Sequence, residues 1–100
     1  MIKYDKVVIK KSSNPKKKLS AVFSASGSSR TKTIHFGQAG APDYTKTKDK
    51  ERKRLYILRH RQRENWNSPT TAGALSRWVL WNKESRSASI NDFKRRFNLK

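Results

Sequence analysis

The stretch WNSPTTAGALSRWVLWN, from Trp66 to Asn82, contains all three tryptophans and a single charged residue, in a chain of 100 residues that is 32% charged. Ser68 followed by Pro69 is typical of a helix start, because the serine hydroxyl can accept from a free backbone N–H and proline has none to satisfy. We therefore expect a helix from Pro69. Its nearly all-round apolar surface predicts cover on more than one side, by the rest of the chain or by a second copy.

Helical geometry assigns faces to this segment. At 100° per residue, Ala72, Leu75 and Val79 share one face, whereas Leu80 and Trp81 point elsewhere. Tryptophans among alanine, leucine and valine usually belong to a core or a self-association surface, and stacking on unpaired bases is the alternative. The tryptophan helix is thus expected to lie at the centre of the fold.

Three segments before residue 37 show strand patterns. Residues 2–11 are rich in β-branched and aromatic types, although the alternation slips at Val7–Val8, where a bulge would fit. Residues 19–25 and 31–36 alternate apolar and polar side chains. Because the connections are short, we expect an antiparallel meander.

The second half of the chain changes to helical spacing. Residues 37–45 contain two glycines and a proline and are expected to form a loop. Residues 48–63 contain neither, and Thr47 is suited to be their N-cap. Leu55 and Leu58 form the apolar stripe that should hold this basic helix, while cations line both of its shoulders.

A third helix is expected at the C-terminus, where Ser89 and Asp92 resemble a capping box before apolar residues at helical spacing. We therefore predict one α+β domain over residues 1–100. It would combine a β-meander in residues 1–36 with a helical part in residues 47–98.

The charge balance indicates the partner. The chain has 25 Lys and Arg against 7 Asp and Glu, a net charge of +18. Self-repulsion of this size opposes a compact state unless a polyanion neutralises it, and nucleic acid is the usual polyanion. The chain lacks cysteine and any apolar run of membrane-spanning length, so we expect no membrane partner.

Cations in four groups are the candidates for phosphate contact. A solvated surface is the alternative for each group, and the lysine-rich turn also resembles a short nuclear-import signal. Arg30 and Lys32 are expected to extend the patch formed by that turn. The candidates are Lys10, Lys11, Lys16, Lys17 and Lys18 in and before the turn, Arg30 and Lys32 in the next connection, Lys48, Arg52, Lys53, Arg59, Arg61 and Arg63 on the basic helix, and Lys94, Arg95 and Arg96 near the C-terminus.

Three residues of the chain fit a known catalytic pattern. Asp43, Glu51 and Lys53 match the PD…(D/E)xK arrangement of metal-dependent nucleases. In that arrangement the second carboxylate and the lysine lie on a strand, whereas Glu51 and Lys53 fall in a helix-favouring segment. His60 and Glu64 lack further metal ligands nearby in sequence. We therefore expect no enzyme activity, no metal and no cofactor.

The blocks KKSSNPKKKL (10–19), KTIHFG (32–37), RHRQRENWNSP (59–69), TAGALSRWVLWNK (71–83) and SINDFKRRF (89–97) occur in this order. The chain thereby resembles a family of small basic proteins of giant nucleocytoplasmic large DNA viruses, of the algal phycodnavirus and mimivirus type. The resemblance implies neither an activity nor a fold. It implies a setting: a virion core with a large double-stranded DNA genome, and the host nucleus or a cytoplasmic viral factory during infection.

The expected function is sequence-independent binding and compaction of double-stranded DNA, a histone-like role. Six to eight phosphate contacts predict that log affinity falls with log salt at a slope of roughly −5 to −7. Compaction needs two basic surfaces or self-association, and a homodimer would provide the latter. The alternatives are an RNA-binding module and a structural virion scaffold whose cations neutralise the genome.

Overall fold

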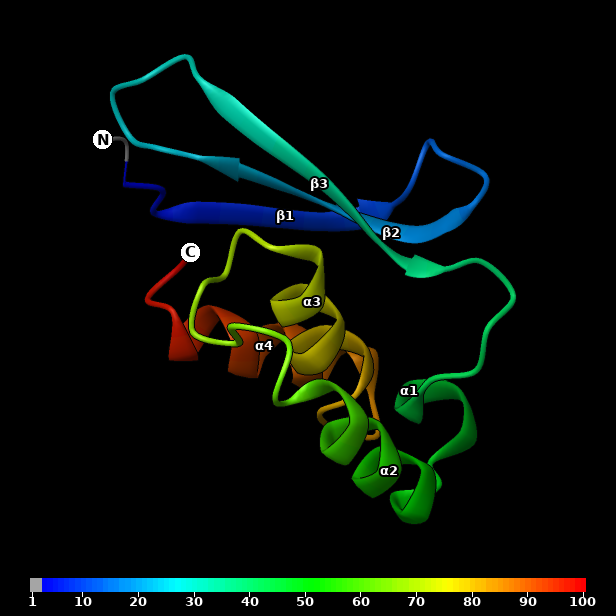
Figure 1. The fold of residues 1–100 in the computed structure, drawn as a ribbon. Coiled ribbons are helices and arrows are strands. Elements are labelled where there is room, and N and C mark those ends of the chain that lie inside the picture. The colour runs from blue at the N-terminus through cyan, green and yellow to red at the C-terminus, as the bar shows by residue number, and fades with distance from the viewer. Residues whose placement is uncertain (1–2) are drawn as a thin grey trace.

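The computed structural model describes residues 3–100 and shows a three-stranded antiparallel sheet with helices on one face (Figure 1). The strands β1 (Lys6–Lys11), β2 (Lys17–Ser24) and β3 (Thr31–Gln38) lie in the order β1-β2-β3. They are followed by α1 (Tyr44–Thr47), α2 (Lys50–His60), α3 (Ala72–Leu75), the π-helical turn η1 (Ser76–Leu80) and α4 (Arg86–Arg96). The predicted α+β class with an N-terminal meander is confirmed, and α1 is an additional short helix.

Alternation along the strands decides which face of the sheet is buried. Val7 is 1% exposed, whereas its neighbour Val8 is 48% exposed. Pairing of β1 with β2 is continuous from Lys6 to Lys11, so the bulge considered at these valines does not form. The start predicted at residue 2 lies outside the described residues, and β1 begins at Lys6. The other two strands begin and end within two residues of their predicted bounds.

The opposite face of the sheet is not covered by a helix within residues 3–100 (Figure 1). Short hydroxyl-bearing side chains, valines and lysines occupy it. By register, its residues are Lys6, Val8 and Lys10 on β1, Ser20, Val22 and Ser24 on β2, and Thr31, Thr33 and His35 on β3. The sheet is therefore amphipathic, as expected for antiparallel strands that pack on one side only.

The hydrophobic core lies between the sheet and the helical segments α3, η1 and α4. Phe23 and Phe36 from the sheet are fully buried against Leu75 and Phe93, which are also fully buried. Each such side chain contributes about 1.5–3 kcal/mol by leaving water. The buried cluster contains no residue of α2. This helix is therefore attached to the core rather than part of it.

The helix of the tryptophan segment begins later than predicted. Pro69 lies in a turn, and the N-cap is Thr71, whose Oγ1 accepts from the backbone N–H of Ala74 at 3.2 Å. Because α3 begins at Ala72, this alanine is exposed at the helix start and Ala74 is buried in its place. The prediction that Ala72 shares a face with Leu75 and Val79 is therefore wrong, because those two residues are buried.

A π-helical turn changes the faces that follow. In η1, the backbone N–H of Trp81 donates to the carbonyl of Ser76 at 3.1 Å, a step of five residues. A five-residue repeat places Leu80 on the same face as Leu75. Both leucines are buried in one cluster, so the prediction that Leu80 points to a different face from Leu75 is wrong. The π turn lets the segment bury Leu75, Val79 and Leu80 together.

Helix α1 precedes the predicted basic helix, and Lys48 and Asp49 separate it from α2, which covers Lys50–His60 of the predicted residues 48–63. Asp43 caps α1 through its side chain, and Lys48 ends α1 with φ 53°. Asp49 then caps α2 by accepting from the N–H groups of Glu51 and Arg52. The prediction of Thr47 as N-cap is wrong, because aspartates on either side of α1 satisfy the free N–H groups of both helices.

The leucines do not hold α2. Leu55 and Leu58 are 39% and 42% exposed, whereas Tyr56 is 7% exposed. The Tyr56 ring stacks on Trp81 with a centroid distance of 4.6 Å. Lys53 donates from Nζ to the carbonyl of Asn82 at 2.6 Å. The prediction that Leu55 and Leu58 hold this helix is therefore wrong. Tyr56 and Lys53 attach α2 to the segment after η1 instead.

The C-terminal helix starts earlier than predicted. Its N-cap is Ser85, whose Oγ accepts from the N–H of Ala88 at 3.0 Å. Ser89 is buried inside the helix and accepts from the N–H of Lys83 at 2.9 Å. Asp92 accepts from Asn82 Nδ2 at 2.7 Å. Both supposed capping-box residues thus connect α4 to the loop before it, which leaves Ser85 as the cap.

Candidate nucleic-acid interface

A small hollow at one end of the sheet is lined by cations from four parts of the chain. It has a volume of about 440 Å³ and lies between the β1–β2 turn, the loop after β3, α1 and the start of α4. Within residues 3–100, no carboxylate lines it. We name this hollow the basic pocket, and its cations are Lys11, Lys17, Lys18, Lys46 and Arg86.

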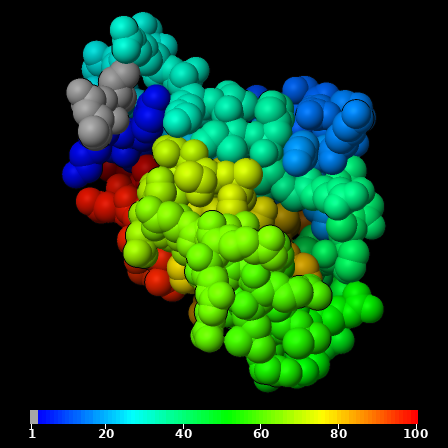
Figure 2. All heavy atoms as spheres, in the orientation of Figure 1, coloured from blue at the N-terminus to red at the C-terminus, as the bar shows by residue number. Residues whose placement is uncertain are grey.

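The lysine-rich turn is held in a fixed shape. Asn14 Oδ1 accepts from the N–H of Lys16 at 3.0 Å, and Ser12 Oγ accepts from the N–H of Asn14 at 3.0 Å. The N–H of Ala39 donates to the carbonyl of Lys16 at 3.0 Å, which joins the turn to the loop after β3. Figure 2 shows these two segments, blue and green-cyan, side by side at one end of the molecule. The turn therefore presents Lys16 and Lys17 on a rigid support.

Lys18 is not available to a ligand. Its ammonium forms an ion pair with Asp43, and the two side chains are 9% and 1% exposed. Burial by itself would raise the pKa of Asp43, but hydrogen bonds from Lys18 and Thr45 outweigh it and hold the pKa below its ordinary value of 3.8. Arg86 adds a further favourable charge. The predicted phosphate contact of Lys18 is replaced by a structural role that fixes the loop after β3.

A larger hollow adjoins the basic pocket and shares Lys17 and Lys18 with it. It has a volume of about 750 Å³ and lies between the end of β3, α2 and the α3–η1 segment. Its exposed cations are Lys17, Arg52 and Arg59. We name it the aromatic cleft, because its walls include Phe36, Tyr56, His60 and Trp81.

Three rings form a column in the wall of the aromatic cleft. His60 stacks on Tyr56 with a centroid distance of 4.3 Å, and Tyr56 stacks on Trp81 with its plane tilted by 5°. Glu64 fixes the end of the column: its Oε1 lies 3.3 Å from His60 Nδ1, and its Oε2 accepts from Trp66 Nε1 at 2.8 Å. Burial raises the pKa of Tyr56, so this ring stays neutral.

Two predicted contact residues are occupied within the protein. Lys53 donates to the carbonyl of Asn82 and lies over the Tyr44 ring at 4.9 Å, and its burial lowers its pKa. The guanidinium of Arg96 lies 3.8 Å from the centroid of the Trp78 ring and 3.4 Å from Asp92 Oδ2. Both cations therefore stabilise the fold, which reduces their availability to phosphates.

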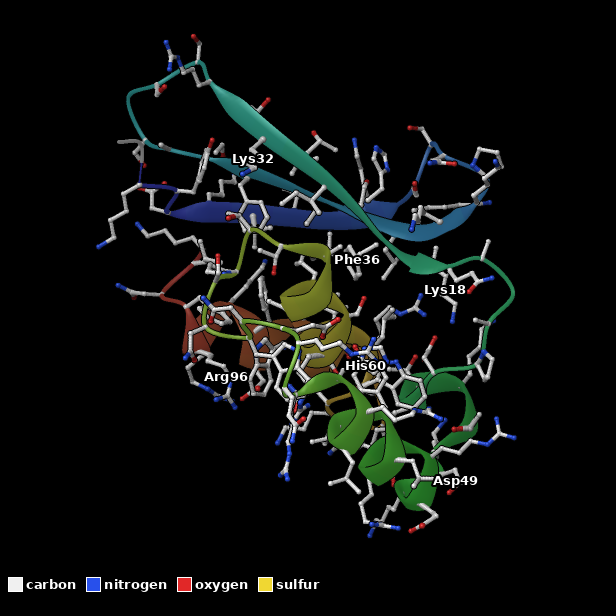
Figure 3. All side chains as sticks on the ribbon, viewed as in Figure 1. Lys18, Lys32, Phe36, Asp49, His60 and Arg96 are labelled. Carbon is white, nitrogen blue, oxygen red and sulfur yellow. The ribbon has the colours of Figure 1, made fainter. Side chains whose placement is uncertain are left out.

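Two other groups lie away from the basic pocket. Arg30 and Lys32 are at the β2–β3 end of the sheet, and Figure 3 shows Lys32 and Lys18 at opposite ends. The expectation that Arg30 and Lys32 extend the lysine-rich turn is wrong, because successive turns of an antiparallel meander alternate between the two ends. Lys94 and Arg95 are in the last turn of α4, whereas Arg86 at its start lines the pocket.

The remaining candidates are exposed but separate. Lys10 is on the open face of the sheet, Lys48 follows α1, and Arg61 and Arg63 follow α2. None of these four lines either hollow. Their contribution to binding would be that of mobile surface charge.

The fold adds two cations that the sequence reasoning did not select. Lys46 on α1 and Arg86 on α4 line the basic pocket although 40 residues separate them in the chain. Lys46 belongs to the basic run before α2, so its charge was visible in the sequence, but Arg86 lies in a polar connection without any local signal. The buried Nε of Arg86 has no hydrogen-bond partner within residues 3–100. Only the tertiary structure unites these two residues with the turn.

The groups of the nuclease pattern do not form a site. Asp43 is paired with Lys18, and Glu51 is paired with Arg54 on the exposed side of α2 at 2.5 Å. Hydrogen bonding from Arg54 lowers the pKa of Glu51. Among residues 3–100, no three acidic or histidine side chains gather as a metal-binding group. None of the helices there is long and apolar enough to cross a bilayer.

These observations define a basic α+β domain with a cationic pocket beside an aromatic cleft. A family model described as "Family of unknown function (DUF5754)" matches residues 7–60, more than half of the chain. The chain belongs to this family. No curated protein and no solved structure matches the chain. The matched family does not identify the organisms that carry it, so the viral setting stays a prediction.

Proposed function

We propose that this protein binds double-stranded DNA without sequence preference and compacts it, with phosphates held at the basic pocket and along the exposed edge of the aromatic cleft. The observation that carries this proposal is the gathering of cations from β1, β2, α1 and α4 around a pocket that no carboxylate of residues 3–100 lines. Apart from Lys18, which is paired, six exposed or partly exposed cations line these two hollows; one of them, Arg52, also lies 3.8 Å from Asp49 in a solvent-exposed pair. We name the six the interface cations: Lys11, Lys17, Lys46, Arg52, Arg59 and Arg86.

Electrostatics supports an anionic ligand at this place. Four of the interface cations surround a pocket of only about 440 Å³, and the nearby carboxylate of Asp43 is already paired with Lys18. Like charges at such separations repel, and the repulsion is relieved when an anion enters. Lysine and arginine donors then form charge-assisted hydrogen bonds to phosphate oxygens. Contacts with phosphates alone carry no sequence information, so no sequence preference is expected.

Compaction needs a second contact with DNA. The apolar face of the tryptophan segment is buried by the protein's own sheet and α4, so it offers no large surface for a second copy. Four exposed or partly exposed cations far from the basic pocket provide an alternative. We name Arg30, Lys32, Lys94 and Arg95 the remote cations; Arg95 pairs with Asp92 at 3.3 Å, but its side chain stays 78% exposed. They would bridge a second duplex segment, in keeping with packaging of a genome in a virion.

The test is a salt-dependent gel shift of plasmid and of a matched duplex RNA, followed by imaging of the plasmid complexes. We expect binding that weakens steeply with salt and compacted plasmid at high protein ratios. Unaffected plasmid mobility at physiological salt would refute the proposal. Tighter binding to RNA than to DNA would replace it with RNA binding, and assembly without nucleic acid would favour a scaffold.

A further inference from the structure

We propose that the aromatic cleft binds an unpaired nucleotide, with its base stacked on the ring column and its phosphate at the exposed cations of the cleft. This ligand goes beyond the duplex binding proposed above. The inference rests on the proposed function in one respect: Lys17, Arg52 and Arg59 would contact the phosphates of a duplex and of an unpaired nucleotide alike.

The ring column ends in an accessible imidazole. Trp81 covers one face of Tyr56 and His60 covers the other, so Tyr56 itself is only 7% exposed. The side chain of His60 is 38% exposed and lines the cleft. A base placed on His60 would become the fourth ring of the column. Stacking on aromatic side chains tolerates any base, because every base has a π face.

The size and lining of the cleft suit a nucleotide. Its volume of about 750 Å³ is within the range of small-molecule sites, which are mainly apolar with a few placed polar groups. Phe36, Leu80 and Trp81 supply apolar wall on the side of the sheet and η1. Arg59 precedes His60 on α2, Arg52 lies about two helical turns before it, and both cations line the same cleft as His60.

The stacking platform is fixed before a ligand arrives. Glu64 contacts both His60 and Trp66, and Gly73 lies so close to Glu64 that an added Cβ would be 2.9 Å from its carboxyl carbon. Lys53 holds α2 to Asn82. A side chain that is already ordered loses little entropy when a ligand binds, which favours affinity. The same arrangement explains why α2 stays attached although its leucines are exposed.

The experiment compares two single strands of equal charge. One is a twelve-nucleotide oligothymidylate, and the other is an abasic strand of the same length, which keeps the phosphates and lacks the bases. We expect the wild-type protein to bind the strand with bases about tenfold more tightly at equal salt. A further arm measures free deoxyadenosine monophosphate, whose binding would identify the nucleotide rather than the strand as the ligand.

Variants of His60 separate stacking from charge. His60→Ala is expected to abolish the tenfold preference, and His60→Phe is expected to keep it, because phenylalanine retains the ring and loses both nitrogens. Leu58→Ala is the matched control, since Leu58 is an exposed residue of the same helix and lines neither hollow. Circular dichroism and urea unfolding would show that each variant is folded.

The outcomes are distinguishable from failure of the proposed function. Equal affinity of the wild-type protein for both strands would overturn this inference, and plasmid binding with a steep salt dependence would leave the duplex proposal intact. A preference that survives in His60→Ala would also overturn it. A preference lost only in His60→Ala would support the nucleotide site even if plasmid were not compacted.

Discussion

The salt dependence of DNA binding can be calculated from the interface cations. Each phosphate contact with duplex DNA changes the slope of log affinity against log salt by about −0.9. Six interface cations therefore predict a slope of about −5. Between 50 and 200 mM salt, such a slope corresponds to a loss of affinity of roughly a thousandfold. The measurement is fluorescence anisotropy of a labelled 30-base-pair duplex across this range.

A quadruple variant tests which residues make the phosphate contacts. Replacement of Lys11, Lys17, Lys46 and Arg86 by glutamine leaves two interface cations and predicts a slope of about −2. Its affinity should fall only about tenfold over the same salt range. The four residues come from separate segments of the chain, so the effect requires the pocket that the fold creates.

The control changes the same amount of charge elsewhere. Replacement of the remote cations by glutamine also lowers the net charge from +18 to +14. We expect this variant to keep the slope of about −5 on the short duplex. It should nevertheless fail to compact plasmid in electron micrographs, because the bridging contact is lost. Equal slopes in the two quadruple variants would refute the assignment of the interface cations, since DNA binding would then depend on net charge rather than on these residues.

Three further predictions concern stability and can be checked by urea unfolding. Because the folded-state pKa of Asp43 is below 3.8, the stability that its ionised carboxylate contributes is complete above about pH 5 and is lost as pH falls below 3.8. Asp43→Asn should lower the free energy of unfolding by about 3 kcal/mol at pH 7 and reduce its decrease at acid pH. An unchanged decrease at acid pH would contradict this assignment. Gly37→Ala should cost about 2–3 kcal/mol, because φ is 78° and its Cβ would meet Leu80 at 2.8 Å, whereas Gly27→Ala, at φ 76° in open space, should cost about 1 kcal/mol. Phe93→Ala should cost about 3–5 kcal/mol, and a comparable loss in the exposed control Leu58→Ala would refute the assigned core.

The sequence predicted the sheet well because its signal is local. Alternation around Phe23 and Phe36 sets the buried face, and the short connections set the order of the strands. Helix contacts were harder to predict, because a helical wheel does not show where the neighbouring element will lie. Leu55 is more apolar than Tyr56, yet the tyrosine faces Trp81 and the leucine faces water.

Features that depend on tertiary structure escaped prediction. The left-handed Lys48 ends α1 at the residue where a helix was predicted to begin, and lysine does not favour that conformation. The π turn at residues 76–80 brings Leu80 onto the buried face of the segment, and no residue type in the turn requires a π-helical geometry. In the site, the turn lysines were predicted from their own cluster. The pairing of Lys18 with Asp43 and the arrival of Arg86 depended on segments far apart in sequence.

The division of the core has a consequence for the family. The matched span ends at residue 60, before Leu75, Leu80 and Phe93, which cover the sheet. A polypeptide that ended at that boundary would leave Phe23 and its neighbours exposed to solvent. A sheet with such an exposed apolar face would associate with other chains instead of folding alone. Any relative that shares only the matched span must therefore shield it with a different C-terminal segment or with a neighbouring molecule.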